Sequence, residues 1–308
     1  MADEFYLTSP FIGEYFRRNI TPEEFSEIST SKADLILYMN FEEAFLQLTK
    51  TYQEFEKYIL ENALDFLLFA ESDYNYFQDS RVLANIRVLS ILNSITSIRD
   101  QAPRLKDIRG KHNLRERLLE LWNQEKENSI TFAFTERFRN YAQHQTQPVH
   151  STTTGGSWDA SGSLCEHHTS AFAKVSDVCG NRKINQNERD SYINEFGEYA
   201  DICLLIRESM ASIGRINDSI RSEFKETIDY KISRLDSYLE YGEGKTLDAV
   251  HIHNSEIHSK IPIFHNFIKR INDLRSNVFL KNNHKHFITN RYRGHSNSRK
   301  IRISMNKI

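Results

Sequence analysis

The sequence predicts an all-α protein, a helical bundle with a small β-hairpin or loop insertion. Apolar residues recur at helical spacing over long stretches, and one central stretch is rich in Ser, Thr and Gly. Proline and glycine are scarce, at 5 and 11 of 308 residues. A chain of this length can bury a large core without disulfides. We therefore expect a globular helical protein.

The first predicted helix begins at Asn40, because Asn40 and Glu43 have the spacing of a capping box. Apolar residues follow at helical spacing: Phe41, Ala44, Phe45, Leu48, Tyr52, Phe55, Ile59, Ala63 and Leu67. The run from Val82 to Ile98 is apolar on most sides, which indicates a second helix that is buried in the bundle and ends before Pro103. We expect these two helices to form an antiparallel core.

A shorter helix is predicted from Leu114 to about Gln124, and another begins near Ser129 and ends before Pro148. This later helix carries apolar residues on one face: Ile130, Phe134, Phe138 and Tyr141. The Ser/Thr/Gly-rich stretch that follows predicts a loop or a β-hairpin turning on Gly155 and Gly156.

Helical periodicity returns from Asn187 to Leu239, where Gly242 and Gly244 predict a stop, and a last helix is expected over about 263–279. The predicted organisation has four parts. They are an N-terminal helical part over 1–145, the insertion over 146–186, C-terminal helices over 187–280 that complete the same bundle, and a basic tail over 281–308.

Charge and cysteine content indicate the partners and the compartment. The net charge is -2, but the tail has no Asp or Glu and carries eight cations: Lys281, Lys285, Arg291, Arg293, Arg299, Lys300, Arg302 and Lys307. Such a tail is either an ordinary solvated terminus or a segment that attracts a polyanion. Three cysteines without a framework indicate a reducing compartment, and no stretch is long and apolar enough for a membrane span. We expect a cytoplasmic protein with no membrane partner.

The segment Arg137-Phe-Arg139-Asn140-Tyr-Ala-Gln-His144 places cations, an amide and an imidazole together on the helix before Pro148. RNA is cleaved by its own 2'-hydroxyl when one group takes that proton, another protonates the leaving oxygen and a cation holds the charge on phosphorus. Histidine titrates near pH 6.5 and arginine forks onto phosphate, so His144 and Arg139 suit these roles. We interpret Arg137 as either an RNA contact or a solvated side chain.

Helix geometry limits this hypothesis. At about 100° per residue, His144 shares a face with Asn140 but lies about 140° around the helix from Arg139. Arg139 and His144 can meet at one phosphate if the helix is irregular there, or if two copies of the helix meet across a dimer axis. A homodimer is therefore part of the hypothesis.

The run Arg139-Asn140-Tyr-Ala-Gln-His144 resembles the hallmark motif of the HEPN superfamily, an Arg, a polar residue, three residues and a His on a helix of a small bundle. The resemblance implies a metal-independent endoribonuclease with its site at a homodimer interface, as in toxins and antiviral defence effectors. The resemblance implies catalytic roles for Arg139 and His144 and a supporting role for Asn140. It also implies that the substrate is RNA and that the partner is an antitoxin or regulatory protein. No cofactor or metal is expected.

Two alternatives stay open. A loose Arg-to-His pattern arises by chance in a chain with many of both residues, so the chain is alternatively a non-catalytic helical module that binds nucleic acid or protein.

Two histidine clusters are also visible. Cys165, His167, His168 and Cys179 lack the paired spacing of zinc sites and predict a polar hairpin, whereas His251, His253, His258 and His265 predict surface histidines or a supporting substrate contact.

Overall fold

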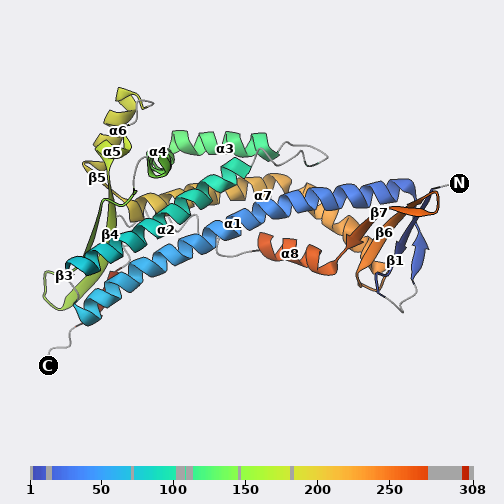
Figure 1. Cartoon of the computed structure of the whole chain (residues 1–308), viewed down its shortest axis with the longest axis horizontal. Coiled ribbons are helices and arrows are strands. Elements are labelled where there is room, and N and C mark those ends of the chain that lie inside the picture. The colour runs from blue at the N-terminus through green and yellow to red at the C-terminus, as the bar shows by residue number, and fades with distance from the viewer. Residues whose placement is uncertain are drawn as a thin grey trace. The chain divides into compact units, whose positions relative to one another are not determined.

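The protein combines long helices with two antiparallel sheets (Figure 1). The prediction of an all-α fold is therefore wrong, and the fold is mixed α/β. The computed structural model describes residues 3–11, 16–70, 73–101, 108, 114–144, 147–180, 184–276 and 300–304. The chain divides into two compact units: unit 1 comprises residues 1–44, 101–119 and 217–277, and unit 2 comprises residues 45–100, 120–216 and 278–308.

Unit 1 contains a four-stranded antiparallel sheet that was not predicted. Its order is β2-β1-β6-β7, with β1 at Glu4–Thr8, β2 at Arg17–Asn19, β6 at Leu247–His253 and β7 at Glu256–Ile263. Asn254 and Ser255, both with positive φ, form the tight turn between β6 and β7. Polar residues that tolerate this conformation favour a two-residue hairpin.

The first helix, α1 (Pro22–Phe69), begins well before the predicted start at Asn40. Its true start is a capping box, in which Glu24 N donates to Thr21 Oγ1 at 3.1 Å and Thr21 N donates to Glu24 Oε2 at 2.7 Å. Pro22 follows as the first helical residue, a position that tolerates the missing N–H. Asn40 lies in the middle of the helix.

In unit 1, residues 22–44 of α1 run antiparallel to residues 217–240 of α7 (Ile202–Glu240), and α8 (His265–Arg275) completes the unit. Ion pairs show this direction, because residues with higher numbers on α1 pair with residues with lower numbers on α7. They are Glu27 with Arg234 at 2.6 Å, Asp34 with Lys231 at 2.8 Å and Glu42 with Arg221 at 2.6 Å.

Unit 2 is built on the rest of α1 and on α2 (Tyr74–Gln101), which lie side by side and antiparallel, as predicted (Figure 1). Tyr58 Oη donates to the Ser80 carbonyl at 2.7 Å across this pair. The first part of α7 joins them through Arg207, which forks onto Glu56 at 2.7 and 2.9 Å.

Shorter elements complete unit 2. They are the second part of α3 (Leu114–Asn128), α4 (Ile130–His144), α5 (Val175–Val178), α6 (Gln186–Phe196) and a sheet of β3 (Ser151–Trp158), β4 (Leu164–Lys174), β5 (Tyr199–Asp201) and β8 (Lys300–Ser304). In this sheet β4 pairs with the other three strands.

The insertion is a β-hairpin, but it does not turn on Gly155 and Gly156, which lie inside β3. The turn is formed around Asp159, whose Oδ1 accepts from Ser163 N at 2.9 Å and Leu164 N at 3.0 Å. Gly156 is small for a different reason, since a Cβ there would lie 3.0 Å from the ring of His167 on β4.

The single helix predicted from Asn187 to Leu239 is two helices, α6 and α7, separated by β5. Gly197, with φ of +71°, ends α6. Asp201 then caps α7, because its Oδ1 accepts from Cys203 N at 2.8 Å and Leu204 N at 3.3 Å. The predicted stop at Gly242 and Gly244 is confirmed, since α7 ends at Glu240.

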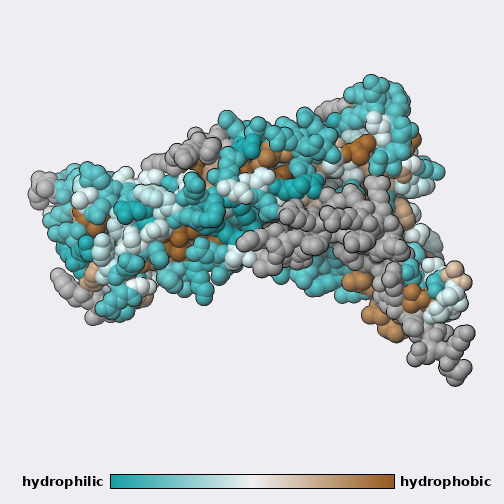
Figure 2. Space-filling model, turned by 180° about the vertical axis from the view of Figure 1, so that it is seen from behind, coloured by the Kyte–Doolittle hydropathy of each residue, from teal (hydrophilic) through white to brown (hydrophobic). Residues whose placement is uncertain are grey.

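The face drawn in Figure 2 is mostly hydrophilic, with hydrophobic residues in small separate groups. Along the part of the chain that the structure describes, no helix combines the length and apolarity needed to cross a bilayer. The three cysteines are free and buried.

Glu56→Ala is expected to lower the free energy of unfolding by about 3–5 kcal/mol, because Arg207, with a side chain only 2% exposed, would keep its charge without a partner. Urea denaturation measures the loss. The matched control is Glu54→Ala, which breaks the exposed pair with Lys57 and should cost about 1 kcal/mol or less. Equal losses in the two variants would contradict the importance of the buried pair.

Glu27 should make unit 1 sensitive to acid. The hydrogen bond from Arg234 lowers the pKa of Glu27 to about 2 from 4.5, against the opposing effect of burial. Because the folded pKa lies below the unfolded one, the stabilisation is complete above about pH 4.5 and is lost as the pH falls towards 2. Glu27→Gln should therefore be less stable than wild type at pH 7, with a gap that narrows towards pH 2 in urea titrations. A gap that is independent of pH contradicts this expectation.

Candidate active site

Helix α4 carries the predicted catalytic motif, and its apolar face fixes which way the motif points. Ser129 caps the helix by accepting from Phe132 N at 3.2 Å. Phe134, Phe138 and Tyr141 are buried on one face, and Phe132 is buried on another side of the helix, where its ring lies 5.0 Å from that of Trp122. Gln143 and His144 are exposed on the other side, with Arg139 and Asn140 half-buried between the two. Burial of the aromatic face therefore turns the polar end of α4 towards solvent.

Glu136 anchors the middle of α4. It accepts hydrogen bonds from Trp122 Nε1 at 2.8 Å and Lys126 Nζ at 2.7 Å on α3, and from Arg99 on α2. Burial would raise the pKa of Glu136, but the bonds from Lys126 and Trp122 outweigh it and lower that pKa. Trp122 is thus a buried structural residue, which excludes it as an exposed surface for base stacking.

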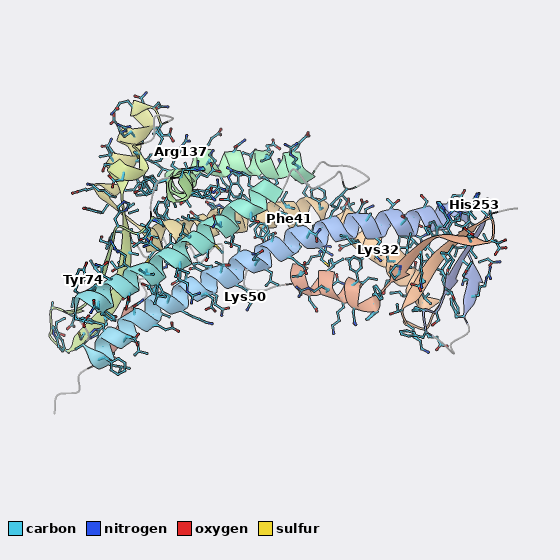
Figure 3. The ribbon with its side chains drawn as sticks, viewed as in Figure 1. Lys32, Phe41, Lys50, Tyr74, Arg137 and His253 are labelled. Atoms are coloured by element: carbon cyan, nitrogen blue, oxygen red, sulfur yellow. The ribbon has the colours of Figure 1, made fainter. Side chains whose placement is uncertain are left out.

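Arg137 is held in an ion pair and points to α6 (Figure 3). Its Nε and Nη2 donate to the two carboxylate oxygens of Glu188 at 2.9 and 3.3 Å, and Tyr192 Oη donates to the same carboxylate at 2.9 Å. The bond with Glu188 raises the pKa of Arg137. The pair favours a structural role for Arg137 over an RNA contact.

Arg139 and Asn140 act as a pair, since Arg139 Nη1 donates to Asn140 Oδ1 at 3.2 Å. This bond draws the guanidinium towards the face that Asn140 shares with His144. Helix α4 is a regular α-helix through its last residue, His144. An irregular helix therefore does not bring Arg139 and His144 together.

His144 makes no hydrogen bond with any residue that the structure describes, and its side chain is exposed. Its neighbour Gln143 is held, because Gln143 Nε2 donates to Asn93 Oδ1 on α2 at 3.0 Å. The residues directly after His144, Gln145 and Thr146, lie outside the described residues. An exposed imidazole without a partner is available to a ligand from solvent.

A second histidine, His150, reaches the end of α4, and it was not among the predicted site residues. His150 Nε2 lies 2.9 Å from Tyr141 Oη and 3.3 Å from Asp177 Oδ2 of α5. His150 Nδ1 accepts from Lys174 N at 3.1 Å. The spacing of Tyr141, His150 and Asp177 in the sequence matches no known motif. The cluster is therefore visible only in the folded structure.

Helix α2 exposes an apolar patch in unit 2. Helix α2 was predicted to be apolar on most sides and buried in the bundle, but Val82, Leu83 and Ile86 are 46%, 48% and 51% exposed. Val82 and Ile86 lie on the side of α2 that carries Asn93, the residue bound to Gln143. Ile86 is seven residues before Asn93, which is about 10 Å along the helix.

The other clusters lie on other elements of the chain. His251, His253 and His258 gather on the β6–β7 hairpin with ring centroids 5.0 to 6.5 Å apart, and Asp3 Oδ1 lies 2.5 Å from His253 Nδ1. Cys165 Sγ lies 3.3 Å from His167 Nε2 on β4. Over the described ranges, no three His, Cys, Asp or Glu side chains are placed to hold a metal ion.

The basic tail is described only at Lys300–Ser304, where it forms β8 and pairs with Leu164–His168 of β4. The rest of the predicted tail, apart from this strand, lies outside the described residues.

Comparison of the chain with known protein families, with curated proteins and with solved structures finds no match in any of the three. The likeness to the HEPN superfamily therefore depends on the run from Arg139 to His144 and on the helix that carries it.

Proposed function

We propose that the protein is a metal-independent endoribonuclease of the HEPN type, with Arg139, Asn140 and His144 in its active site. One observation supports this most. At the solvent-facing end of α4, Asn140 accepts a hydrogen bond from Arg139 and shares a face with an exposed His144 that has no partner among the described residues. Arg137 on the same helix is bound to Glu188.

The proposed reaction begins with loss of the proton from an RNA 2'-hydroxyl, whose oxygen attacks the adjacent phosphorus. The bond from phosphorus to the 5'-oxygen then breaks, and that oxygen takes up a proton. His144 serves as the base or the acid in these transfers, and Arg139 stabilises the charge that builds on the phosphate oxygens. Asn140 orients the guanidinium of Arg139. The products are a 2',3'-cyclic phosphate and a 5'-hydroxyl end.

A second copy of the chain completes the proposed site. On a regular helix Arg139 and His144 point about 140° apart, so one chain does not converge both on one phosphate. Two copies of α4 related by a two-fold axis can each supply one of the two residues. The apolar patch of Val82, Leu83 and Ile86 on α2 is the surface that the second copy would cover.

The proposed biological setting follows from the resemblance. In this proposal the enzyme cuts cellular RNA as a toxin or an antiviral defence effector, and an antitoxin or regulatory protein restrains it.

Wild-type protein is expected to cleave a mixed RNA pool in EDTA and to leave 2',3'-cyclic phosphate ends. Arg139→Ala and His144→Ala should each lower the rate at least about a hundredfold, since each removes a group that acts in the transition state. End-labelled RNA on gels measures both the rate and the ends. The matched controls Arg270→Ala and His258→Ala remove the same side chain types from unit 1 and should cut like wild type.

Salt-sensitive RNA binding by the wild type without cleavage would contradict the enzyme and favour a nucleic-acid-binding module. Cleavage by His144→Ala at the wild-type rate would also contradict the assignment.

Mixing the two inactive variants tests whether the site is shared between copies. In a mixed dimer of Arg139→Ala with His144→Ala, one of the two composite sites keeps both residues. Random pairing makes half of the dimers mixed, so the mixture should recover about a quarter of wild-type activity. If Arg139 and His144 act within one chain, the mixture stays inactive.

Ile86→Asp should disrupt the dimer by placing a charge in the apolar patch, with a shift to monomer in sedimentation and a parallel loss of cleavage. Leu64→Asp is the matched control, because Leu64 is similarly exposed on α1 at 41% but is not part of the patch. An active Ile86→Asp monomer would contradict the shared site.

A further inference from the structure

His150 is fully engaged, in contrast to His144. Its backbone N donates to the Phe172 carbonyl at 2.9 Å, and its ring Nδ1 accepts from Lys174 N at 3.1 Å, so β4 holds both its backbone and its ring. Its Nε2 lies 2.9 Å from Tyr141 Oη and 3.3 Å from Asp177 Oδ2. Neither ring nitrogen is left for a substrate, which excludes a direct catalytic role in this arrangement.

The contacts define the tautomer of His150. A backbone N–H only donates, so Nδ1 must be the acceptor and the proton of the neutral ring lies on Nε2. That proton points to the Tyr141 oxygen and the Asp177 carboxylate. Burial and the nearby Asp177 carboxylate raise the pKa of Tyr141, which keeps its hydroxyl protonated.

Tyr141 transmits this anchor to α4. It lies three residues before His144, on the last turn of the helix, and its ring stacks on the His150 ring at 5.7 Å between centroids and 25° between planes. On another side of the same turn Gln143 is bound to Asn93. The last turn is thus held at two points, and rotation about the helix axis is restricted.

We infer that His150 is a positioning residue for the candidate active site, which holds the last turn of α4 through Tyr141 and so sets the direction of His144. The effect of His150 on cleavage rests on the ribonuclease proposal, whereas the contact between His150 and Tyr141 does not depend on it. Small displacements of a reacting group lower the rate of the chemical step more than the binding of substrate.

The variants are chosen to remove single contacts. Tyr141→Phe removes only the hydroxyl. His150→Asn keeps an acceptor near the place of Nδ1 but loses the contact with Tyr141, whereas His150→Gln keeps a donor near the place of Nε2. Tyr58→Phe is the matched control, since it also removes a buried tyrosine hydroxyl bond in unit 2, to the Ser80 carbonyl at 2.7 Å.

Tyr141→Phe and His150→Asn should each lower kcat about tenfold with KM unchanged. The double variant should be no worse than either single one, because both break the same contact. His150→Gln should recover cleavage to within about threefold of wild type, and Tyr58→Phe should cut at the wild-type rate. Wild-type kcat in Tyr141→Phe, or additive losses in the double variant, would overturn the inference.

Two measurements do not depend on cleavage. Nitrogen-15 spectra of the imidazoles should show the His150 proton on Nε2, and amide hydrogen exchange over residues 140–144 should speed up about tenfold in Tyr141→Phe but not in Tyr58→Phe. If the wild type cuts no RNA but both results are found, the ribonuclease proposal fails and the positioning contact stands. A proton on Nδ1, or unchanged exchange, refutes the contact itself.

Discussion

The pairing of α1 with α7 depends on ion pairs that are largely withdrawn from water. In unit 2 Arg207 forks onto Glu56, and in unit 1 Arg221 forks onto Glu42. Apolar surfaces tolerate a shift of one helical turn at modest cost, because their attraction has no direction. A buried guanidinium displaced from its carboxylate is far more costly. The ion pairs therefore select one register for the two helices in each unit.

This register also places the candidate site within unit 2. Ser209, two residues after Arg207 on α7, donates to Thr135 Oγ1 on the buried face of α4 at 2.8 Å. Glu136, the next residue, is bound by α2 and α3. Both contacts oppose rotation of α4. The polar end of the helix consequently faces solvent for reasons that lie in the core, so a change in the motif side chains need not disturb the fold.

The periodicity of apolar residues predicted the presence of the long helices better than it predicted where they begin and end. The α1–α2 pair and α4 were found because their apolar residues recur over several turns. The start of α1 was missed because Thr21 and Glu24, which form the capping box, precede a stretch with weaker periodicity. The break at Gly197 was missed because apolar residues keep their spacing on both sides of it. At such points local capping residues, and not the periodicity of apolar residues, decide where a helix begins or ends.

The unit 1 sheet was missed for a different reason. Strands β1 and β6 pair Leu7 with Ala249, residues far apart in the chain, and the contacts that stabilise such a strand are not visible in its own short sequence. The same limit applies to the site. The run from Arg139 to His144 is local and was recognised, whereas His150 and Asp177 reach Tyr141 only through the fold of β4 and α5.

The regularity of α4 limits the proposed chemistry more than the motif does. The Arg139–Asn140 bond moves the guanidinium towards the His144 face, but the two backbone positions stay about 140° apart on a straight helix. A second copy removes this difficulty, since its His144 need not share a helix with the Arg139 that it serves. The exposed Val82, Leu83 and Ile86 favour the same arrangement. Apolar side chains in contact with water are unfavourable, and a second copy that covers them would remove this cost.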